Sequence, residues 1–408
     1  MAAGIIAEYN PFHAGHSYQI SEARKLFPRE EIVAVMSGSF SQRGEPTILD
    51  KWTRATLAVE NGIDLVLELP FVSAVRSAQD FASGGVKILS ELGIIDKLVF
   101  GAETSDLKKI QAAAKCFGEK NFPNRIKFEM SSGISYAAAV TKSLSAETNL
   151  PENFFKQPNT ILAVEYLRAL PENIFPVLIP RVGAGYKEKN LQENFSSASA
   201  IRAEVFKKNP AWEKILQVTN KKIFDALQAE KKFGLVRGEN LFLPLLTKIF
   251  TTSPDEIKNF FGMREGLENL ILKSAKNAKN FSDLVNKITN RRYQTSRVKR
   301  LLLYFLLGVT EIESADFIRV LAFNDRGQKL LKKISQVSNL PIVTKVTKHL
   351  TEKDFLQKNF SAPYKKNLAL DISATNLRNI LFDTPKSFGQ DFLTSPKKIF
   401  SLNSADDC

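Results

Sequence analysis

Short apolar runs alternate with longer helical stretches over the first two hundred residues. Turn residues bound five apolar, β-compatible runs, at residues 4–7, 31–36, 64–70, 97–100 and 175–180. Runs of this length between turn signals predict buried strands. Stretches of helical character lie between them, at residues 21–27, 51–61, 77–92 and 160–170. Because strands that alternate with helices need right-handed crossovers, the pattern predicts a parallel sheet.

The later part of the chain has a different pattern. Residues 203–310 have helical character almost throughout. Mixed structure follows, with expected strands at residues 317–323 and 341–343, a helix at 329–336 and a strand-to-helix turn at 368–378. We therefore expect an α/β fold with a Rossmann-like, parallel-sheet domain over residues 1–203, a mainly helical region over 204–310 and a small mixed α/β region over 311–408.

Two of the three histidines in the chain lie in the loop after the first predicted strand. His13 and His16 are three residues apart, with Gly15 beside the second. A loop that leaves a strand and opens a helix presents free N–H groups at the positive end of the helix dipole, which favours an anion. Glycine lets phosphate approach the backbone, and imidazoles donate hydrogen bonds to it. The alternatives are a purely structural turn or a metal pair, but no Cys, Asp or Glu cluster follows at ligand spacing.

A second candidate element precedes the helical part of the chain. Ser197, Ser199 and Arg202 lie in a serine-rich segment just ahead of a predicted helix. Serines at such positions are usually N-caps, so this segment alone indicates little. Together with the histidine loop, the segment resembles the Ser-Ser-Thr-x-Ile-Arg element that nucleotidyltransferases place opposite such a loop, and this resemblance implies a second group of phosphate ligands.

The composition is that of an ordinary globular protein. Hydrophobic residues make up 44% of the chain and charged residues 25%, and the two cysteines give neither a disulfide framework nor a zinc site. The start of the chain lacks the basic segment of a signal peptide, and the apolar stretch at residues 301–307 is too short to span a bilayer. We therefore expect a cytoplasmic protein without a membrane partner.

The net charge of +14 is unevenly distributed. Residues 1–200 contain 21 Lys and Arg against 22 Asp and Glu, whereas residues 201–408 contain 36 against 21. Residues 273–300 hold nine basic side chains and one acid, Asp283. Such a run is usually a solvated face, but arginine forks suit phosphates and stack on bases, and an interleaved tyrosine offers another stacking surface. We therefore expect RNA contacts from the densest part of the run, at Arg291, Arg292, Tyr293, Arg297, Lys299 and Arg300.

The histidine loop also carries a family resemblance. Residues 10–16 read Asn-Pro-Phe-His-Ala-Gly-His, which resembles the His-x-Gly-His signature of the nucleotidyltransferase superfamily. The longer string over residues 4–13, together with residues 36–46, resembles the bacterial tRNA(Met) cytidine acetate ligase family. The likeness extends over most of the chain and is strongest from residue 4 to residue 202. Ala14 departs from the pattern, because family members usually carry Asn there.

The resemblance implies a nucleotidyltransferase domain and a specific reaction. Members activate acetate with ATP as acetyl-adenylate, release pyrophosphate, and acetylate N4 of the wobble cytidine of elongator tRNA(Met). The expected catalytic residues are His13, His16, Ser199 and Arg202. The residues expected near ATP are Ile6, Ala7, Glu8, Tyr9, Asn10, Pro11, Phe12, His13, Gly15, His16, Gly101, Asn159, Arg181, Val182 and Ser197. Mg²⁺ is expected to accompany ATP, with no metal held by the protein itself.

Two other functions stay open from the sequence. One is an adenylyltransferase that acts on a small phosphorylated metabolite, which would share the N-terminal domain but leave the basic half of the chain unexplained. The other is a non-catalytic RNA-binding protein, which would explain the charge but not both phosphate-binding elements.

Overall fold

A single sheet organises the protein. The structure, a computed structural model, describes residues 1–181 and 196–400. Its eight strands run in the order β5-β4-β1-β2-β3-β6-β7, with β8 paired to β6. The first five strands are β1 (Ala2–Ala7), β2 (Glu31–Ser37), β3 (Leu65–Leu69), β4 (Ile95–Ala102) and β5 (Phe175–Pro180). They are mutually parallel, which confirms the five strands and the parallel pairing expected from the sequence.

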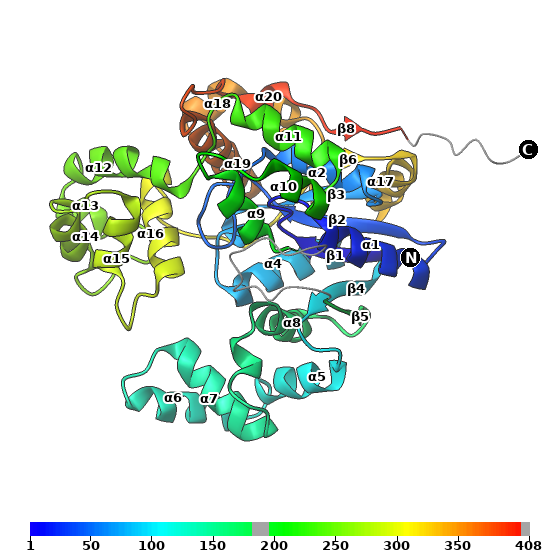
Figure 1. Cartoon of the computed structure of the whole chain (residues 1–408), viewed down its shortest axis with the longest axis horizontal. Helices are drawn as coiled ribbons and strands as arrows, with labels where there is room; N and C mark the ends of the chain where they lie inside the picture. The colour runs from blue at the N-terminus through cyan, green and yellow to red at the C-terminus, as the bar shows by residue number, and fades with distance from the viewer. Residues whose placement is uncertain (182–195, 401–408) are drawn as a thin grey trace, which may run out of the picture.

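Helices bury both faces of this sheet (Figure 1). Along β2, Val33 and Val35 belong to one hydrophobic cluster, whereas Ala34 and Met36 belong to another. The alternation follows from the strand period of two, which sends successive side chains to opposite faces. The first cluster includes α4 (Ala78–Glu91) and α8 (Pro158–Ala169), and the second includes α1 (Ala14–Leu26), α2 (Lys51–Glu60), α9 (Ala198–Val205), α10 (Trp212–Val218) and α11 (Lys221–Lys231).

Two helical lobes extend from the sheet (Figure 1). The smaller contains α5 (Leu107–Cys116), α6 (Phe122–Ser131) and α7 (Tyr136–Thr148). The larger, which we call the basic lobe, contains α12 (Phe242–Phe250), α13 (Pro254–Ile257), α14 (Leu267–Ala275), α15 (Phe281–Ile288) and α16 (Thr295–Leu307). The helical character expected after residue 203 is thus confirmed. No described helix is long and apolar enough to span a membrane.

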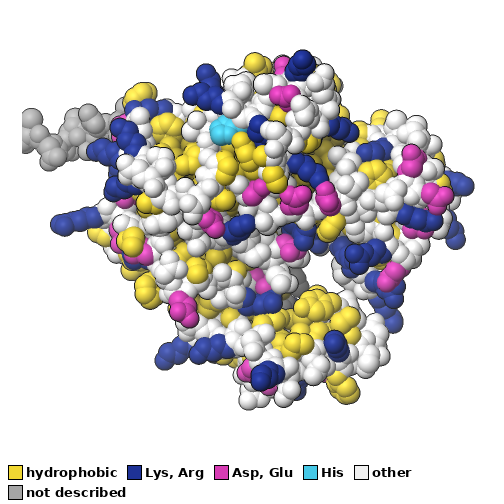
Figure 2. Space-filling view, turned by 180° about the vertical axis from the view of Figure 1, so that it is seen from behind, with side chains coloured by type: hydrophobic (Ala, Val, Ile, Leu, Met, Phe, Trp, Pro, Cys, Tyr) yellow, Lys and Arg dark blue, Asp and Glu magenta, His cyan; other side chains and the backbone are white. Residues whose placement is uncertain are grey.

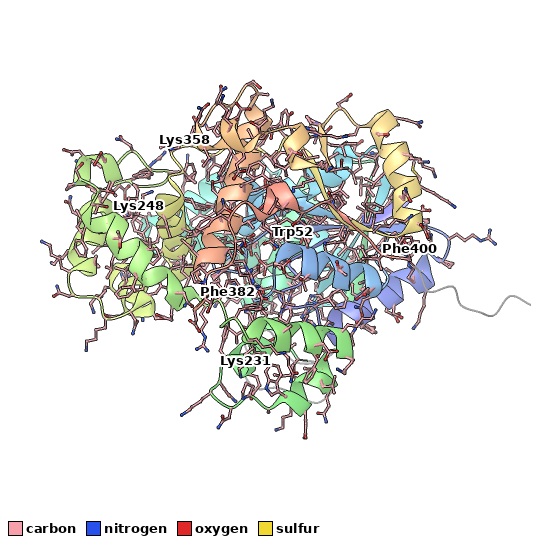
Figure 3. All side chains as sticks on the ribbon, turned by 90° about the horizontal axis from the view of Figure 1, so that it is seen from above. Trp52, Lys231, Lys248, Lys358, Phe382 and Phe400 are labelled. Atoms are coloured by element: carbon pink, nitrogen blue, oxygen red, sulfur yellow. The ribbon has the colours of Figure 1, made fainter. Side chains whose placement is uncertain are left out.

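The C-terminal region extends the same sheet. Strand β6 (Ile318–Phe323) pairs antiparallel with β3, and β7 (Ile342–Val343) and β8 (Lys397–Lys398) flank β6. Its helices are α17 (Asp325–Val337), α18 (Glu352–Leu356), α19 (Pro363–Ile380) and α20 (Gln390–Leu393). Figure 3 shows Lys248 of the basic lobe and Lys358 of this region near the junction of the two. Burial, followed by the charge of Lys358, lowers the pKa of Lys248.

The strand-to-helix turn expected at residues 368–378 is wrong. These residues all lie within the single helix α19. Leu368, Ile372 and Thr375 are 0%, 0% and 2% exposed, and their spacing of four and three places them on one helical face. A short apolar run is compatible with a strand. The helix was not recognised because polar residues such as Asp371 and Thr375 are buried in it, so it lacks a clear polar face.

A buried ion network joins the C-terminal end of the described chain to β3. The Lys51 ammonium lies 2.9 Å from Glu68 Oε1 and 2.7 Å from Asp391 Oδ1. Arg319 of β6 approaches the same two carboxylates, at 3.4 Å and 2.5 Å. Burial alone would raise the pKa of Asp391, but Arg319 and Lys51 outweigh it and the pKa is lowered. Four buried charges that compensate one another therefore fix α20 and β6 against β3.

Candidate active site

A cavity opens at the carboxyl edge of β1, bounded by residues after β2 and β5 and by the starts of α8 and α9. Most of the residues expected near ATP line it, namely Ile6, Ala7, Glu8, Tyr9, Asn10, His13, Gly15, His16, Gly101, Asn159, Arg181 and Ser197. Pro11, Phe12, Ser199 and Arg202 do not line it, and Val182 lies outside the described residues. The parallel sheet thus brings together segments that are distant in the chain, such as those of Ile6 and Ser197, 191 positions apart, as expected for the carboxyl edge.

The two histidines form a capping pair at the start of α1. The Gly15 N–H donates to His13 Nδ1 at 3.0 Å, and the His13 N–H donates to His16 Nδ1 at 3.2 Å. Their rings stack with centroids 3.8 Å apart. A neutral imidazole whose Nδ1 accepts a hydrogen bond carries its proton on Nε2. The backbone therefore sets both histidines as Nε2–H donors.

Burial keeps both imidazoles neutral. Burial and the nearby Arg181 and Arg202 lower the pKa of His13 to about 3. Burial, His13 and Arg181 lower the pKa of His16 well below its ordinary value. A neutral imidazole stabilises a phosphate through hydrogen bonding rather than through a permanent charge.

The residues that precede His13 in the loop hold the two histidines in place. Tyr9 has a left-handed backbone, with φ of 46°, and its ring lies 4.9 Å from that of Phe12 and 4.9 Å from that of His16. Phe12 is fully buried, and the Asn10 side chain accepts a hydrogen bond from the Ile48 N–H at 2.8 Å. Pro11 follows a cis peptide bond. Phe12 and Asn10 thus position the loop by packing and hydrogen bonding.

The serine segment meets the histidine loop at α9. Ser197 caps this helix by accepting from the Ala200 N–H, and its hydroxyl lies 2.9 Å from that of Ser199. The Arg202 guanidinium donates to the Asn10 carbonyl at 2.5 Å. The N-cap role and the approach to the histidine loop therefore occur in the same segment. The positive end of α9 and the Arg202 charge lie beside the histidines, where an anion is favoured.

Glu103 organises the opposite wall of the cavity. Its carboxylate accepts from the Asn159 N–H and side-chain amide at 3.2 and 2.7 Å, and from the Thr160 N–H and hydroxyl at 2.8 and 3.0 Å. A carboxylate at the first turn of α8 satisfies free N–H groups and complements the helix dipole. Gly101 precedes it at the end of β4, and a Cβ there would lie 3.3 Å from the Arg181 side chain.

Arg54 is a site-forming residue that sequence reasoning missed. It is fully buried, and its guanidinium donates to the Glu8 carbonyl at 2.6 Å, to the Ser37 carbonyl at 3.0 Å and to the Gly38 carbonyl. Burial and the charge of Arg378 lower its pKa to about 10. Arg54 thus joins the ends of β1 and β2. No sequence signal marked it, because its partners are backbone groups that a sequence does not reveal.

Helix α19 supports the loop after β2 from outside the cavity. Arg378 donates to the Thr47 and Ile48 carbonyls at 2.8 and 3.1 Å, and Thr375 lies 3.0 Å from Ser39. All five residues are buried, so this part of α19 offers no surface to RNA. The cavity-lining residues Gln42 and Arg43, which the sequence analysis also missed, belong to the supported loop.

The structure divides the expected RNA-binding cluster into three parts. Arg291, Arg292 and Arg297 are exposed, with Arg292 paired to Glu265. Tyr293 is 6% exposed, and its hydroxyl donates to the Arg264 carbonyl at 3.1 Å. The ring therefore supports the loop, and the stacking surface expected from it is not present.

The other two members of the cluster contact the cavity-lining loop after β2. Lys299 pairs with Glu45, and Arg300 donates to the Gln42 carbonyl at 3.4 Å. The described residues contain no group of three or more His, Cys, Asp or Glu side chains that could hold a metal ion.

Comparison with known proteins decides the family. Residues 1–391 match the model of the HIGH Nucleotidyl Transferase family. A tRNA(Met) cytidine acetate ligase from Acetivibrio thermocellus is 36% identical, over 95% of this chain and 97% of the relative. The chain belongs to the tRNA(Met) cytidine acetate ligase family of HIGH nucleotidyl transferases.

Other members of the tRNA(Met) cytidine acetate ligase family agree over the whole fold. The ligase from Halothermothrix orenii is 34% identical, over 94% of this chain and 95% of the relative. Two crystal structures of Thermotoga maritima TmcAL each cover 98% of this chain and 100% of the relative. The apo form has a TM-score of 0.88 at 30% identity, and the form bound with alpha-thio ATP has 0.86 at 29%. The α/β nucleotidyltransferase fold expected from the sequence is confirmed.

Proposed function

We propose that this protein is an ATP-dependent tRNA(Met) cytidine acetate ligase that forms acetyl-adenylate and transfers the acetyl group to N4 of the wobble cytidine of elongator tRNA(Met). The observation that carries the proposal is the pair of neutral Nε2–H donors at the start of α1, facing the capped start of α9 across one cavity. Family membership and the relatives' names support the substrates.

The proposed first step uses positioning and hydrogen bonding. The ATP phosphates lie between the His13 and His16 donors on one side and Ser197, Ser199 and Arg202 on the other. An acetate oxygen attacks the α-phosphorus, and the bond to the departing pyrophosphate breaks. Negative charge develops on the phosphate oxygens, where the imidazole N–H groups and the guanidinium stabilise it. No protein nucleophile is needed. Mg²⁺ enters with ATP as part of the substrate.

In the proposed second step the cytidine amine attacks the acyl carbon of acetyl-adenylate, and AMP leaves. The basic lobe would bind the tRNA. Figure 2 shows a hollow between this lobe and the α5–α7 lobe, with Lys and Arg side chains gathered on the basic lobe beside it. The exposed Arg291, Arg292 and Arg297 supply a phosphate-binding surface of the required sign. A tRNA substrate places the reaction in the cytoplasm.

The direct test measures AMP and pyrophosphate release from ATP, with acetate and tRNA each present or absent. Turnover that requires both, with N4-acetylcytidine in the digested tRNA, is the expected result. Turnover that is indifferent to acetate and tRNA would instead indicate an adenylyltransferase for a small metabolite. Tight tRNA binding without any turnover would indicate a binding protein.

Binding through the basic lobe has its own test. Replacing Arg291 and Arg297 with Glu is expected to weaken tRNA binding by more than about tenfold and to flatten its salt dependence. Replacing the exposed Lys329 and Lys332 of α17 with Glu changes the net charge equally, far from the lobe, and serves as the control. Equal affinity losses in the two variants would exclude a specific role for the lobe.

A further inference from the structure

One acidic side chain stands out in the cavity. Among its described lining residues, Glu8 is the sole carboxylate, whereas His13, His16, Arg43 and Arg181 supply imidazole and guanidinium groups. A site for a polyphosphate gains from cations and hydrogen-bond donors, and a carboxylate next to phosphate is unfavourable. Glu8 therefore needs a role other than contact with the ATP phosphates.

The carboxylate is fixed at one oxygen. Glu8 Oε1 accepts from the Gln42 N–H at 2.7 Å, and Arg54 holds the Glu8 carbonyl at 2.6 Å. Within residues 1–181 and 196–400, Oε2 has no hydrogen-bond partner, and the side chain is half-buried. One oxygen is thus anchored to the loop after β2, and the other is available to a ligand in the cavity.

Strand order places the anchor of Glu8 on the opposite side of β1 from Arg181. Gly101 lies at the end of β4 and Arg181 follows β5, on one side of β1. The anchor of Glu8, Gln42, follows β2 on the other side. If Arg181 and the histidines bind the ATP phosphates, the second substrate approaches Glu8 from the side of Gln42.

Resting on the proposed function, we infer that Glu8 binds the exocyclic amine of the target cytidine and accepts its proton during acetyl transfer. A carboxylate oxygen accepts a hydrogen bond from cytosine N4–H₂, and this contact distinguishes cytosine from uracil, which presents a carbonyl there. As N4 forms its bond to the acetyl carbon, one N4 proton passes to Glu8 Oε2. The bond from the acetyl carbon to the AMP phosphate oxygen then breaks, and AMP leaves as the anion.

The inference separates the two half-reactions, and paired variants test it. Glu8→Gln keeps an oxygen that accepts from the Gln42 N–H, but its amide cannot accept a proton. It is expected to lose acetyl transfer to tRNA by about 100-fold or more, a far larger loss than that of acetate-dependent ATP–pyrophosphate exchange. Glu30→Gln, which breaks an ion pair with Lys97 at the opposite edge of the sheet, is the matched control and is expected to change neither half-reaction.

Synthetic acetyl-adenylate, supplied with tRNA, allows acetyl transfer to be measured separately from the reaction with ATP. His13→Ala is expected to lose exchange but to transfer acetyl from the synthetic intermediate, whereas Glu8→Gln is expected to show the reverse pattern. Loss of exchange by Glu8→Gln to the same extent as transfer would overturn the inference, because Glu8 would then act on ATP or only support the loop. Unchanged transfer would overturn it as well. If the unmodified protein neither exchanges nor transfers, the proposed function itself fails and the inference with it.

Discussion

The Lys299 ammonium lies 2.5 Å from the Glu45 carboxylate, although 254 positions separate the two residues in the chain. Burial alone would raise the pKa of Glu45, but Lys299 outweighs it and the pKa is lowered. Lys299 lies in the second turn of the basic lobe's last helix, α16, and Glu45 belongs to the loop that also contributes Gln42 and Arg43 to the cavity. The proposed RNA-binding lobe is therefore joined directly to the catalytic edge.

Breaking this pair is expected to uncouple the lobe from the cavity. Lys299→Met should raise the KM for tRNA several-fold and leave acetate-dependent pyrophosphate exchange unchanged, because the ATP ligands are untouched. The partly exposed pair contributes only up to about 1 kcal/mol to stability, so the fold should persist. Lys258→Met removes an exposed ion pair with Asp255 in the same lobe and is the control. Identical tRNA kinetics in the two variants would contradict the coupling.

Substitution of Gly44 is expected to destabilise the protein, because Gly44 belongs to the same contact between the loop after β2 and helix α16. Its φ is 76°, and a Cβ there would lie 3.0 Å from the Arg300 backbone nitrogen. Gly133 has a φ of 78°, but no atom lies within 4 Å of its Cβ position. Gly133→Ala should therefore cost only the left-handed strain, about 1 kcal/mol, whereas Gly44→Ala should cost more because helix α16 must move. Thermal unfolding of both variants measures the difference in stability. An equal loss of melting temperature in the two variants would show that α16 is not tightly packed against Gly44.

The histidine pair predicts how stability depends on pH. Below pH 6.5 the unfolded chain protonates its histidines, but the folded protein does not protonate His13 until the pH approaches 3. The unfolded state then binds more protons, so stability falls as the pH falls from 6.5 towards 3. His13→Asn should reduce the loss of melting temperature between pH 7.5 and pH 5 in the ligand-free protein. His349→Asn, at a partly exposed histidine, should change it less, and the opposite order would contradict the assignment.

Removing a charge from the buried ion network should lower the free energy of unfolding much more than removing a charge from a surface ion pair. Lys51→Met leaves Glu68 and Asp391 with Arg319 as their one described cation, and breaking a buried pair costs about 3–5 kcal/mol. Lys25→Met removes an exposed pair with Glu22 and should cost less than about 0.5 kcal/mol. Denaturant unfolding of both variants checks the prediction. A small effect of Lys51→Met would show that the remaining charges rearrange or protonate without penalty.

Local patterns were sufficient for the elements that build the catalytic sheet. Each of the five parallel strands is a short apolar run between turn residues, so its position follows from neighbouring residues alone. The helix expected at residues 77–92 is present as α4, with Ser77 as its N-cap. The first helix was expected too late, from residue 21, because a histidine serves as its N-cap at position 13.

Contacts between residues far apart in the chain could not be predicted from local sequence patterns. Strand β6 joins β3 antiparallel across more than 240 residues, and α19 was mistaken for a turn because the partners of its buried polar residues lie far away in the chain. The same holds for Arg54, whose partners are backbone carbonyls.

By itself, the sequence determined the parallel sheet and its carboxyl edge, since these depend on local periodicity and turn chemistry, and through a family resemblance it predicted two phosphate-binding segments. Only the tertiary structure decided which basic residues remain exposed and which, like Lys299, bind the catalytic loop. It also decided the Nε2–H state of the histidines and the isolated carboxylate of Glu8. The physical reason is that burial, charge pairing and tautomer depend on groups brought together by folding, whose identity one chain read in order does not specify.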